Sequence, residues 1–435
     1  MTSSAILLIF ISLLFCCILF DISVIPALLA GYLLFFFYGL GKGIKVKRLL
    51  SLSLSGILSI RSVLFTYTMI GCLTAIWRVS ATTPLIVCAA VEFIYPSLFL
   101  VISFLLCAIM STLTGTFLGA LTTLGIICMT LGKSIGIDPI LLGGAILSGC
   151  RAGDRCSPIS TSALLISTVT DTSIYHNIKN MVRCCTVPFA ASCLFYLFLG
   201  SGQTISVSCE NIIALMKNNF TITPLAFIPV LLVIILPLFR VKIQYTIALS
   251  IIFAYAIALF TQGASHHQLL EVMVNGYHPA NAELASILSG GGIASMVNIL
   301  LILLITSTYS RLFEAIGILK ETELLLTSLS RKITPYGTLL LTSIIMSIIT
   351  CGQSLTIILT AQLCSSIYPS RSRLAAALED TAAVIPALIP WSVCCAIPLA
   401  TLDVSANSLL FACYIWMLPL WHFISQRFVE EENHS

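Results

Sequence analysis

The chain has 435 residues, of which 58% are apolar and only 9% are charged, and its net charge is +4. Soluble domains carry about 25% charged residues, so this composition excludes a protein whose whole surface faces water. The basic residues stand in short clusters between apolar stretches and form no continuous surface for nucleic acid. We therefore expect the lipid bilayer, and no nucleic acid, as the partner that surrounds this chain.

Apolar segments recur along the chain, and most approach the roughly 20 residues that a helix needs to cross a membrane. They are too long for the strands of a membrane barrel and lack its alternation. The first segment resembles a signal peptide but lacks a basic start, so we expect a retained helix. The sequence predicts an all-α polytopic membrane protein with about 10–12 transmembrane helices. The apolar segments are 4–20, 24–40, 62–77, 84–108, 113–131, 181–200, 222–239, 243–261, 293–313, 336–350, 382–401 and 405–425.

Clusters of Lys and Arg predict which loops face the cytoplasm, where such residues concentrate. The first cluster lies between the second and third apolar segments, so the N-terminus is expected inside as well. The expected location is a bacterial cytoplasmic (inner) membrane. The clusters are Lys42, Lys45, Lys47, Arg48 and Arg61, then Arg240 and Lys242, and then Arg331 and Lys332.

Polar stretches divide the chain into parts. The stretch 262–283 holds His266, His267 and His278. A metal site or a pH sensor is one interpretation, but we favour a solvated loop with an interfacial helix because nothing fixes the geometry of these histidines. The 17 cysteines show no CxxC spacing and are interpreted as small buried side chains. We expect N-terminal helices with a basic loop at 1–61, a first transport repeat at 62–200, a linker with scaffold helices and a polar loop at 201–283, a second transport repeat at 284–425 and a polar tail at 426–435.

Two regions, 112–171 and 352–391, mix Gly, Ser, Thr, Pro and charges into sequence of membrane length. Such interruptions at corresponding places in two halves indicate a transporter site built from broken helices. In the first region Asp154 stands between Arg151 and Arg155, and a charge inside a membrane persists mainly where function uses it. In the second, a Gly-polar break again precedes an acidic element, here Glu379 and Asp380. The shared order predicts two inverted repeats with broken helices or re-entrant hairpins.

Each acidic residue also has a purely structural explanation. Asp154 could simply pair with Arg155 at a loop that holds two helices together. Glu379 and Asp380 could start a solvated helix, where the helix dipole stabilises carboxylates. Glu314 could lie at the membrane interface. The sequence alone leaves these alternatives open.

Several blocks resemble the NhaC-type sodium/proton antiporters. They are TGTFLG (114–119), GAILSGCRAGDRCSPIS (144–160), GGGIASM (290–296), FEAIGIL (313–319) and LEDTAAVIPALIPW (378–391). They fall in the family's order and span most of the chain. The resemblance implies exchange of Na⁺ for H⁺ without a cofactor, or a related exchange such as malate for lactate, and is compatible with a homodimer. The candidate ion-binding or coupling residues are Asp154, Ser157, Ser160, Thr114, Gly115, Thr116, Glu379, Asp380, Thr381 and Glu314. Asp154 and Asp380 are the candidate Na⁺ ligands, and the candidate structural or gating residues are Pro158, Gly153, Arg155, Gly352, Gln353, Gly291, Pro390 and Trp391.

The chain departs from the family pattern at three places. Thr161 to Leu164 replaces the family's D-T-T-N, Ser392 replaces an asparagine, and Phe117-Leu118 replaces Ser-Trp. Because hard cations prefer several oxygen ligands, a site with fewer of them is expected to bind Na⁺ less strongly.

Two alternatives to Na⁺/H⁺ exchange follow from the residues. An organic acid or amino acid carrier would use Arg151 or Arg155 to pair with a substrate carboxylate. An intramembrane enzyme is disfavoured because the aspartates lack YD and GxGD contexts and the chain has no HExxH, GxSxG or P-loop. For the exchanger, the two flanking arginines make Asp154 an orienting or gating charge, and Glu379 or Asp380 the expected proton carrier.

Overall fold

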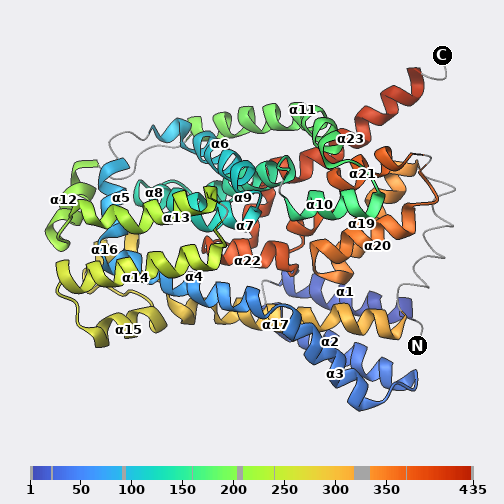
Figure 1. The fold of residues 1–435 in the computed structure, drawn as a ribbon, viewed down its shortest axis with the longest axis horizontal. Coiled ribbons are helices and arrows are strands. Elements are labelled where there is room, and N and C mark those ends of the chain that lie inside the picture. Colours follow the sequence, from blue (N-terminus) through green and yellow to red (C-terminus); the bar gives the residue numbers. More distant parts are fainter. Residues whose placement is uncertain are drawn as a thin grey trace.

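A computed structural model describes residues 3–20, 23–90, 95–158, 160–202, 209–239, 241–317, 334–368 and 370–432. Within these ranges the secondary structure is helical, apart from one isolated bridge between Tyr277 and Gly290. The all-α prediction is therefore confirmed (Figure 1). The predicted loop residues Arg240, Arg331 and Lys332 lie outside the described ranges.

The helices follow one another in four groups along the chain. The N-terminal group is α1 (Ser3–Leu19), α2 (Ile25–Gly41), α3 (Val46–Ser59), α4 (Arg61–Val79) and α5 (Thr82–Ala90). The second is α6 (Pro96–Thr114), α7 (Phe117–Ala120), the π-helix η2 (Leu121–Gly125), α8 (Ile126–Ser134), α9 (Pro139–Arg155), α10 (Thr161–Thr170) and α11 (Ile174–Ser201). The third is α12 (Cys209–Asn219), the 3₁₀ helix η3 (Pro224–Phe227), α13 (Ile228–Leu238), α14 (Ile243–Thr261), α15 (His266–Asn275), α16 (Ala282–Leu288) and α17 (Gly292–Ile316). The fourth is α19 (Pro335–Thr350), α20 (Gln353–Cys364), α21 (Arg371–Asp380), the 3₁₀ helix η4 (Ile385–Leu388), α22 (Val393–Thr401), the 3₁₀ helix η5 (Ala406–Phe411) and α23 (Cys413–Glu432).

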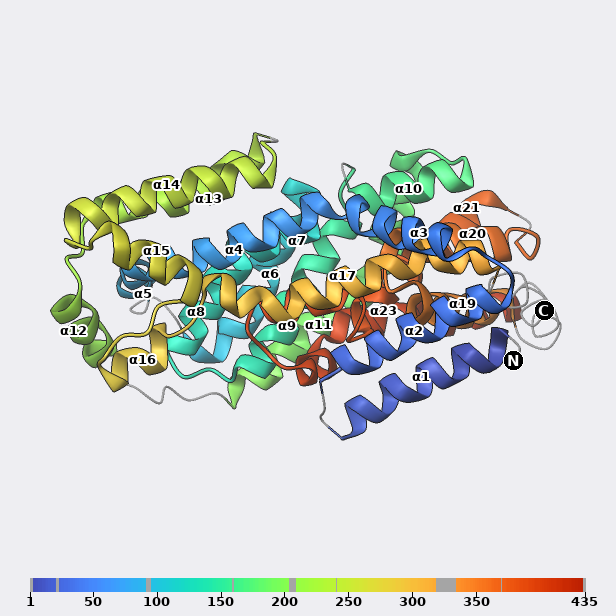
Figure 2. The ribbon, with the colours of Figure 1, turned by 90° about the horizontal axis from the view of Figure 1, so that it is seen from below.

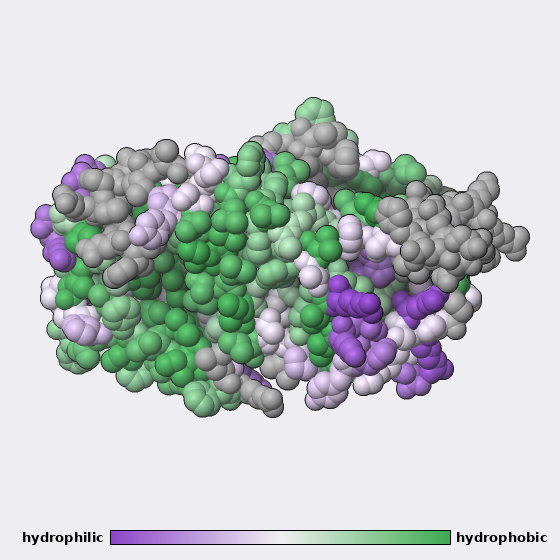
Figure 3. Space-filling view, turned by 90° about the horizontal axis from the view of Figure 1, so that it is seen from above, coloured by the Kyte–Doolittle hydropathy of each residue, from purple (hydrophilic) through white to green (hydrophobic). Residues whose placement is uncertain are grey.

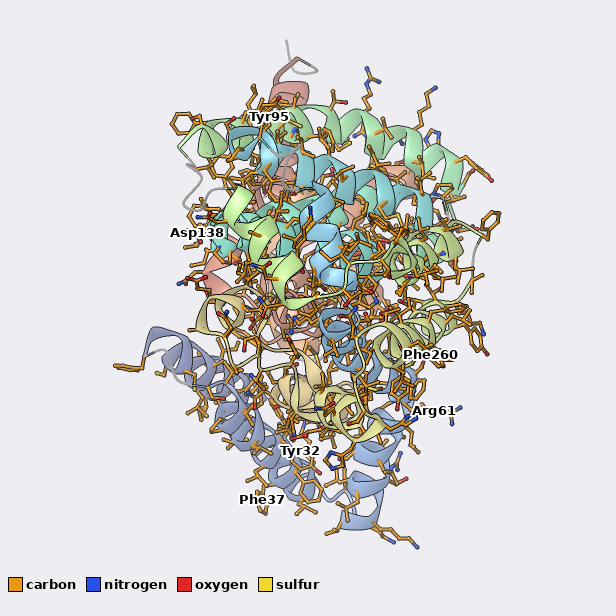
Figure 4. The ribbon with its side chains drawn as sticks, turned by 90° about the vertical axis from the view of Figure 1, so that its left-hand side faces the viewer. Tyr32, Phe37, Arg61, Tyr95, Asp138 and Phe260 are labelled. Atoms are coloured by element: carbon orange, nitrogen blue, oxygen red, sulfur yellow. The ribbon has the colours of Figure 1, made fainter. Side chains whose placement is uncertain are left out.

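The surface and the helix lengths are those of a multi-pass membrane protein. In the described ranges, 6 helices are long and apolar enough to cross a membrane, or up to 8 when each bent pair is taken as one span. Four shorter apolar helices, among them α10, α19 and α20, account for further segments. Phe37 and Phe260 point outward from the bundle (Figure 4), and their side chains are 63% and 88% exposed. Apolar residues cover much of the face in Figure 3, as a lipid-facing surface requires.

Two helix breaks occur at corresponding places in the second and fourth groups. Gly115 follows the last residue of α6 and Cys351 follows that of α19, and both residues adopt the left-handed conformation with φ of 63° and 53°. The N–H groups of these residues donate to the carbonyls of Ser111 and Ser347, at 2.9 and 3.3 Å. After each break a later helix carries an acidic residue in its last turn, Asp154 in α9 and Asp380 in α21. The repeated order predicted from the sequence is thus present in the helices, and their inverted orientation stays a prediction.

Close helix packing holds the first arm together. α6 and α9 approach so closely that a Cβ at Gly153 would overlap the carbonyl oxygen of Ala108. The hydroxyl of Ser111 on α6 donates to the carbonyl of Cys150 on α9 at 2.7 Å. Figure 2 shows α4 and α17 side by side along the length of the molecule, next to this arm. These contacts fix the end of α9, where the charged residues lie.

The histidines of the polar stretch each have their own neighbours. His266 lies 2.9 Å from the hydroxyl of Tyr255, and His278 lies 3.2 Å from that of Ser289. His267 lies 4.0 Å from Glu271, and both of these side chains are exposed. Among the described residues, the group of metal-ligating side chains lies elsewhere and includes none of these histidines. The described part of the chain has 16 free cysteines, as expected for small apolar side chains.

Candidate ion-binding site

Asp154 lies in the last turn of α9 and is buried, with 5% of its surface exposed. One carboxylate oxygen accepts a hydrogen bond from the hydroxyl of Ser160 at 3.0 Å. The other accepts from the guanidinium of Arg151 at 3.5 Å. Arg151 also lies over the ring of Phe117, 4.3 Å from its centroid. The backbone N–H of Phe117 also interacts with this carboxylate. Since a carboxylate can accept about four hydrogen bonds, Asp154 has acceptor capacity left for a further ligand.

Asp154 faces a cavity of about 580 Å³ that lies between the two arms. Polar side chains from both arms line the cavity, and Lys242 stands at the start of α14. The rest of the wall is apolar. The polar lining residues are Thr114, Thr116, Arg151, Asp154, Thr161, Lys242 and Gln353, and the apolar ones include Val63, Pro237, Val393 and Ile397.

The break after α6 brings two hydroxyls to this cavity. Gly115 adopts φ of 63°, a conformation that side chains with a Cβ rarely take, so the chain turns here between Thr114 and Thr116. Thr114 donates its hydroxyl to the carbonyl of Met110 at 2.9 Å, whereas Thr116 is exposed. A Cβ at Gly119 would overlap the Thr116 hydroxyl oxygen, so a larger residue there would displace this hydroxyl.

The acidic pair of the second arm lies away from the cavity wall. Glu379 and Asp380, at the end of α21, are 0% and 1% exposed. Asp380 forms a salt bridge with Arg155 of α9 and contacts His422 of α23 through its other oxygen. Arg155 also donates to the carbonyl of Glu379 at 3.2 Å and to the hydroxyl of Tyr414 at 3.3 Å. Arg155 therefore connects the ends of the two arms with α23.

Glu379 differs from Asp380 because neither of its carboxylate oxygens has a hydrogen-bond partner among the described residues. The same holds for the buried hydroxyl of Ser157. Thr381, fully buried, donates to the carbonyl of Ala377 at 2.7 Å and accepts from Ser343 at 3.1 Å. Burying an ionised carboxylate without hydrogen-bond partners costs much free energy. The protonation state of Glu379 therefore affects the stability of the folded protein.

The remaining predicted residues have mostly structural contacts. Gln353 donates to the carbonyl of Ala383 at 2.6 Å, and Trp391 donates to the carbonyl of Ile348 at 3.3 Å. Gly352 is extended, Pro158 is exposed and Pro390 is half-buried. Gly291 has φ of 76° and lies against the guanidinium of Arg78. Glu314 lies in α17, and its side chain is outside what the structure describes.

The positions that depart from the family pattern have different surroundings. Thr161 lines the cavity, so a hydroxyl stands there. Leu164 is 47% exposed and is absent from the cavity wall. Ser392 donates to the carbonyl of Cys351 at 3.2 Å and caps α22 by accepting from the N–H of Cys394. Ser392 thus stabilises the second break by satisfying a carbonyl that the broken helix leaves free.

Sequence reasoning missed three residues near the site. Tyr414 and His422 lie on α23, in a segment that we had assigned only as apolar. Lys242, expected only in a cytoplasmic loop, lines the cavity. A histidine inside a membrane segment is itself unusual, and that signal was available for His422.

Comparison with known proteins leads to the same family as the sequence blocks. Residues 149–425 match the model of the Na⁺/H⁺ antiporter family. The chain belongs to the Na⁺/H⁺ antiporter family. It is 27% identical to the Na⁺/H⁺ antiporter NhaC of Alkalihalophilus pseudofirmus over 82% of this chain and 79% of the relative. It is 25% identical to the malate-2H⁺/Na⁺-lactate antiporter of Bacillus subtilis over 86% of this chain and 82% of the relative.

A third relative widens the range of cargoes. The chain described here is 23% identical to the arginine/ornithine antiporter ArcD of Halobacterium salinarum, over 76% of this chain and 70% of the relative. Proteins similar to this chain therefore differ in the cargo that their names give. The family match includes Asp154, Arg155, Glu379 and Asp380, which form the buried charges described above.

Proposed function

We propose that this chain is a secondary antiporter that exchanges Na⁺ for H⁺ across a bacterial cytoplasmic membrane. The observation that carries the proposal is the buried Asp154 at a cavity with the hydroxyls of Thr114, Thr116 and Thr161. Carboxylate and hydroxyl oxygens are the ligands that hard cations prefer. The similarity to Na⁺/H⁺ antiporters in two bacilli supports the same cargo.

The coupling follows from competition at carboxylates. A carboxylate must lose its proton before it can bind a metal ion, so Na⁺ and H⁺ exclude each other at Asp154. If the cavity opens alternately to the two sides, each exposure exchanges one ion for the other, and the gradient of one drives the other. The broken helices that flank the cavity are the elements expected to move.

We assign different tasks to the three carboxyl groups. Asp154 faces the cavity and binds the cation, with Ser160 orienting one oxygen. Glu379, buried without hydrogen-bond partners among the described residues, holds a proton in this state. Asp380 is held by Arg155 and His422 and joins the two arms. Compared with the expectation from the sequence, this division makes Asp154 the group at which cation and proton compete, and Glu379 a second group that carries a proton.

The test measures dissipation of a pH gradient by Na⁺ in vesicles that contain the purified chain. Asp154→Asn is expected to abolish exchange, because the amide can neither release a proton nor neutralise a cation. Glu379→Gln is expected to fold and to lose the coupling. Glu271→Gln, which changes a carboxylate that is 60% exposed, serves as the matched control and keeps wild-type exchange. Wild-type exchange by both Asp154→Asn and Glu379→Gln would contradict the proposal.

One observation favours a second candidate, the exchange of an organic anion. The cavity holds two cationic side chains, Arg151 and Lys242, and Nε of Arg151 has no hydrogen-bond partner among the described residues. Arginine pairs with carboxylates through two parallel hydrogen bonds. The volume of about 580 Å³ is also larger than a cation alone needs. Similarity to the malate-2H⁺/Na⁺-lactate antiporter supports this candidate.

The orientation and assembly belong to the same proposal. We place the segment between α2 and α4, which contains α3 and the first cluster of Lys and Arg, in the cytoplasm, following the positive-inside rule. The two arms proposed as inverted repeats are 62–200 and 284–425. A homodimer is compatible with the large exposed apolar surface of the helices, which lipid or a second copy would cover.

A further inference from the structure

A second set of chemically reactive side chains lies next to Arg155, the residue after Asp154, and outside the lining of the cavity. Cys184 of α11, Asp380 of α21 and His422 of α23 each direct one metal-ligating atom to a common point, and these atoms all lie within 4.8 Å of one another. The three residues come from three different helices. Among the described residues, this is the group of three or more such side chains that the fold brings together.

The donor atoms differ in kind from those at the cavity. A thiolate, an imidazole and a carboxylate form a ligand set typical of Zn²⁺, which takes three protein ligands and leaves a fourth position open. Na⁺ prefers oxygen ligands alone. None of the three side chains lines the cavity that holds Asp154. The group is therefore not another part of the proposed Na⁺ site.

The surroundings of His422 hold its ring in place. The ring of Tyr336 stacks on it with 4.4 Å between centroids and an interplanar angle of 1°. The hydroxyl of Tyr336 donates to the carbonyl of Pro419, on the same helix as His422, at 3.1 Å. Groups that fix the orientation of a ligand raise the affinity of a metal site. The imidazole thus keeps one orientation relative to Asp380.

Exposed charged residues lie close to Cys184 in α11 and at the start of α21. Hydrophilic residues gather toward one end of the face shown in Figure 3. Lys179 and Arg183 of α11 are exposed, and Arg371, at the start of α21, pairs with the exposed Asp171 at 2.5 Å. Cys184 follows Arg183 directly and is half-buried. The thiol is therefore the least buried of the three side chains.

We propose that Cys184, Asp380 and His422 form a binding site for a thiophilic divalent cation, with Zn²⁺ as the type case. The ion takes the place between the carboxylate of Asp380 and the imidazole of His422, which now touch. Cys184 releases its proton as the metal–sulfur bond forms, and the fourth position is open to water. Asp380 keeps Arg155 on its other oxygen. The inference concerns metal binding and stands independently of the proposed ion exchange.

The experiment uses the purified full-length chain in detergent, freed of metals by a chelator. After dialysis against Zn²⁺, elemental analysis is expected to find about one metal ion fewer per chain in Cys184→Ser and in His422→Ala than in the wild type. Cys193→Ser changes another half-buried thiol of α11 outside the group and is the matched control, with wild-type binding. Co²⁺, used as a probe in place of Zn²⁺, should give thiolate-to-metal absorption that Cys184→Ser loses and Cys193→Ser keeps.

A second measurement distinguishes loss of the metal site from misfolding of the variants. Zn²⁺ binding to the native state should raise the unfolding temperature of the wild type and of Cys193→Ser, but not that of Cys184→Ser or His422→Ala. Equal metal content and equal temperature shifts in the wild type and in Cys184→Ser would overturn the inference, because other thiols would then hold the metal. So would a wild type that binds no Zn²⁺.

Discussion

At the scale of single residues, the buried charges of this protein differ in how they are compensated. Asp154 has a hydroxyl, a distant guanidinium and a cavity. Asp380 contacts Arg155 through one oxygen and His422 through the other, and it is buried. A site that must bind and release an ion needs the first kind of environment. The second kind suits a charge that holds parts of the structure together.

The pair of Arg155 and Asp380 gives a prediction on stability. Arg155→Met leaves Asp380 buried next to a histidine alone, and breaking a buried ion pair costs about 3–5 kcal/mol. The double variant Arg155→Met with Asp380→Asn removes the uncompensated charge and should recover part of that loss. The unfolding temperature of the purified variants in detergent measures both effects.

An exposed ion pair provides the control. Arg371 and Asp171 are 70% and 84% exposed, and such pairs contribute about 0–1 kcal/mol. Arg371→Met should therefore leave the unfolding temperature nearly unchanged. If Arg155→Met and Arg371→Met destabilise the protein equally, the interpretation of Arg155 as a connector of two arms is wrong.

At the scale of helices, the position of Asp154 depends on how closely α9 packs on α6. Gly149 and Gly153 face the backbone of α6, where the carbonyls of Phe104 and Ala108 leave no room for a Cβ. The hydrogen bond from Ser111 to Cys150 joins the two helices at the same level. Since Gly153 immediately precedes Asp154, any separation of the helices moves the carboxylate relative to Thr114 and Thr116.

Gly153→Ala tests this packing. The added methyl group must push against backbone atoms, and overpacking of this kind costs typically about 1–3 kcal/mol. We expect a lower unfolding temperature together with weaker dependence of exchange on Na⁺. Gly41→Ala is the control, because a Cβ there meets nothing within 4 Å and alanine favours the helix over glycine. A Gly153→Ala protein with wild-type stability and exchange would show that this contact does not position Asp154.

The sequence predicted the elements better than their contacts. Helix length, the breaks at Gly115 and Gly352 and the acidic ends of the following helices were all visible, because apolar runs, glycines and buried charges leave local signals. The partners of the charges were not. Arg155 meets Asp380 across 225 positions and Asp380 meets His422 across 42. No local sequence pattern indicates contacts between residues so far apart in the chain. From the sequence, Asp154 and Arg155 were possible partners, whereas the structure pairs Asp154 with Arg151 and Ser160.

At the scale of the whole molecule, the cavity exists only because the two arms and the scaffold helices meet. Its wall takes Thr116 and Asp154 from the first arm and Gln353 and Val393 from the second. Lys242, which immediately precedes α14, completes it. A relative movement of these parts changes the depth of the cavity without breaking any single helix. This arrangement suits alternating exposure of a central site. It also means that the cargo is decided by side chains from several segments together.

The identity of the cargo gives the last prediction. We expect Na⁺ alone to collapse a preset pH gradient across vesicles, with no effect of added malate or lactate and with no uptake of the labelled acids. The physical reason is that Arg151 already pairs with Asp154 at 3.5 Å, and that the carboxylate and hydroxyl oxygens lining the cavity are the ligands that hard cations prefer. Arg151→Gln should then weaken exchange only moderately, since it changes the environment of Asp154 but removes no cation ligand.

The opposite result has a clear signature. If an organic anion is the cargo, gradient collapse requires the acid, labelled acid enters the vesicles, and Arg151→Gln loses uptake by about tenfold or more, as expected when a charged pair worth roughly 1.4 kcal/mol or more disappears. Lys133→Gln is the matched control, because Lys133 pairs with Asp403 at 3.3 Å and lies outside this cavity. Loss of uptake in Arg151→Gln with normal uptake in Lys133→Gln would show that the protein exchanges an organic anion and not Na⁺ for H⁺. The Asp154→Asn variant would still test Asp154 as the cation ligand.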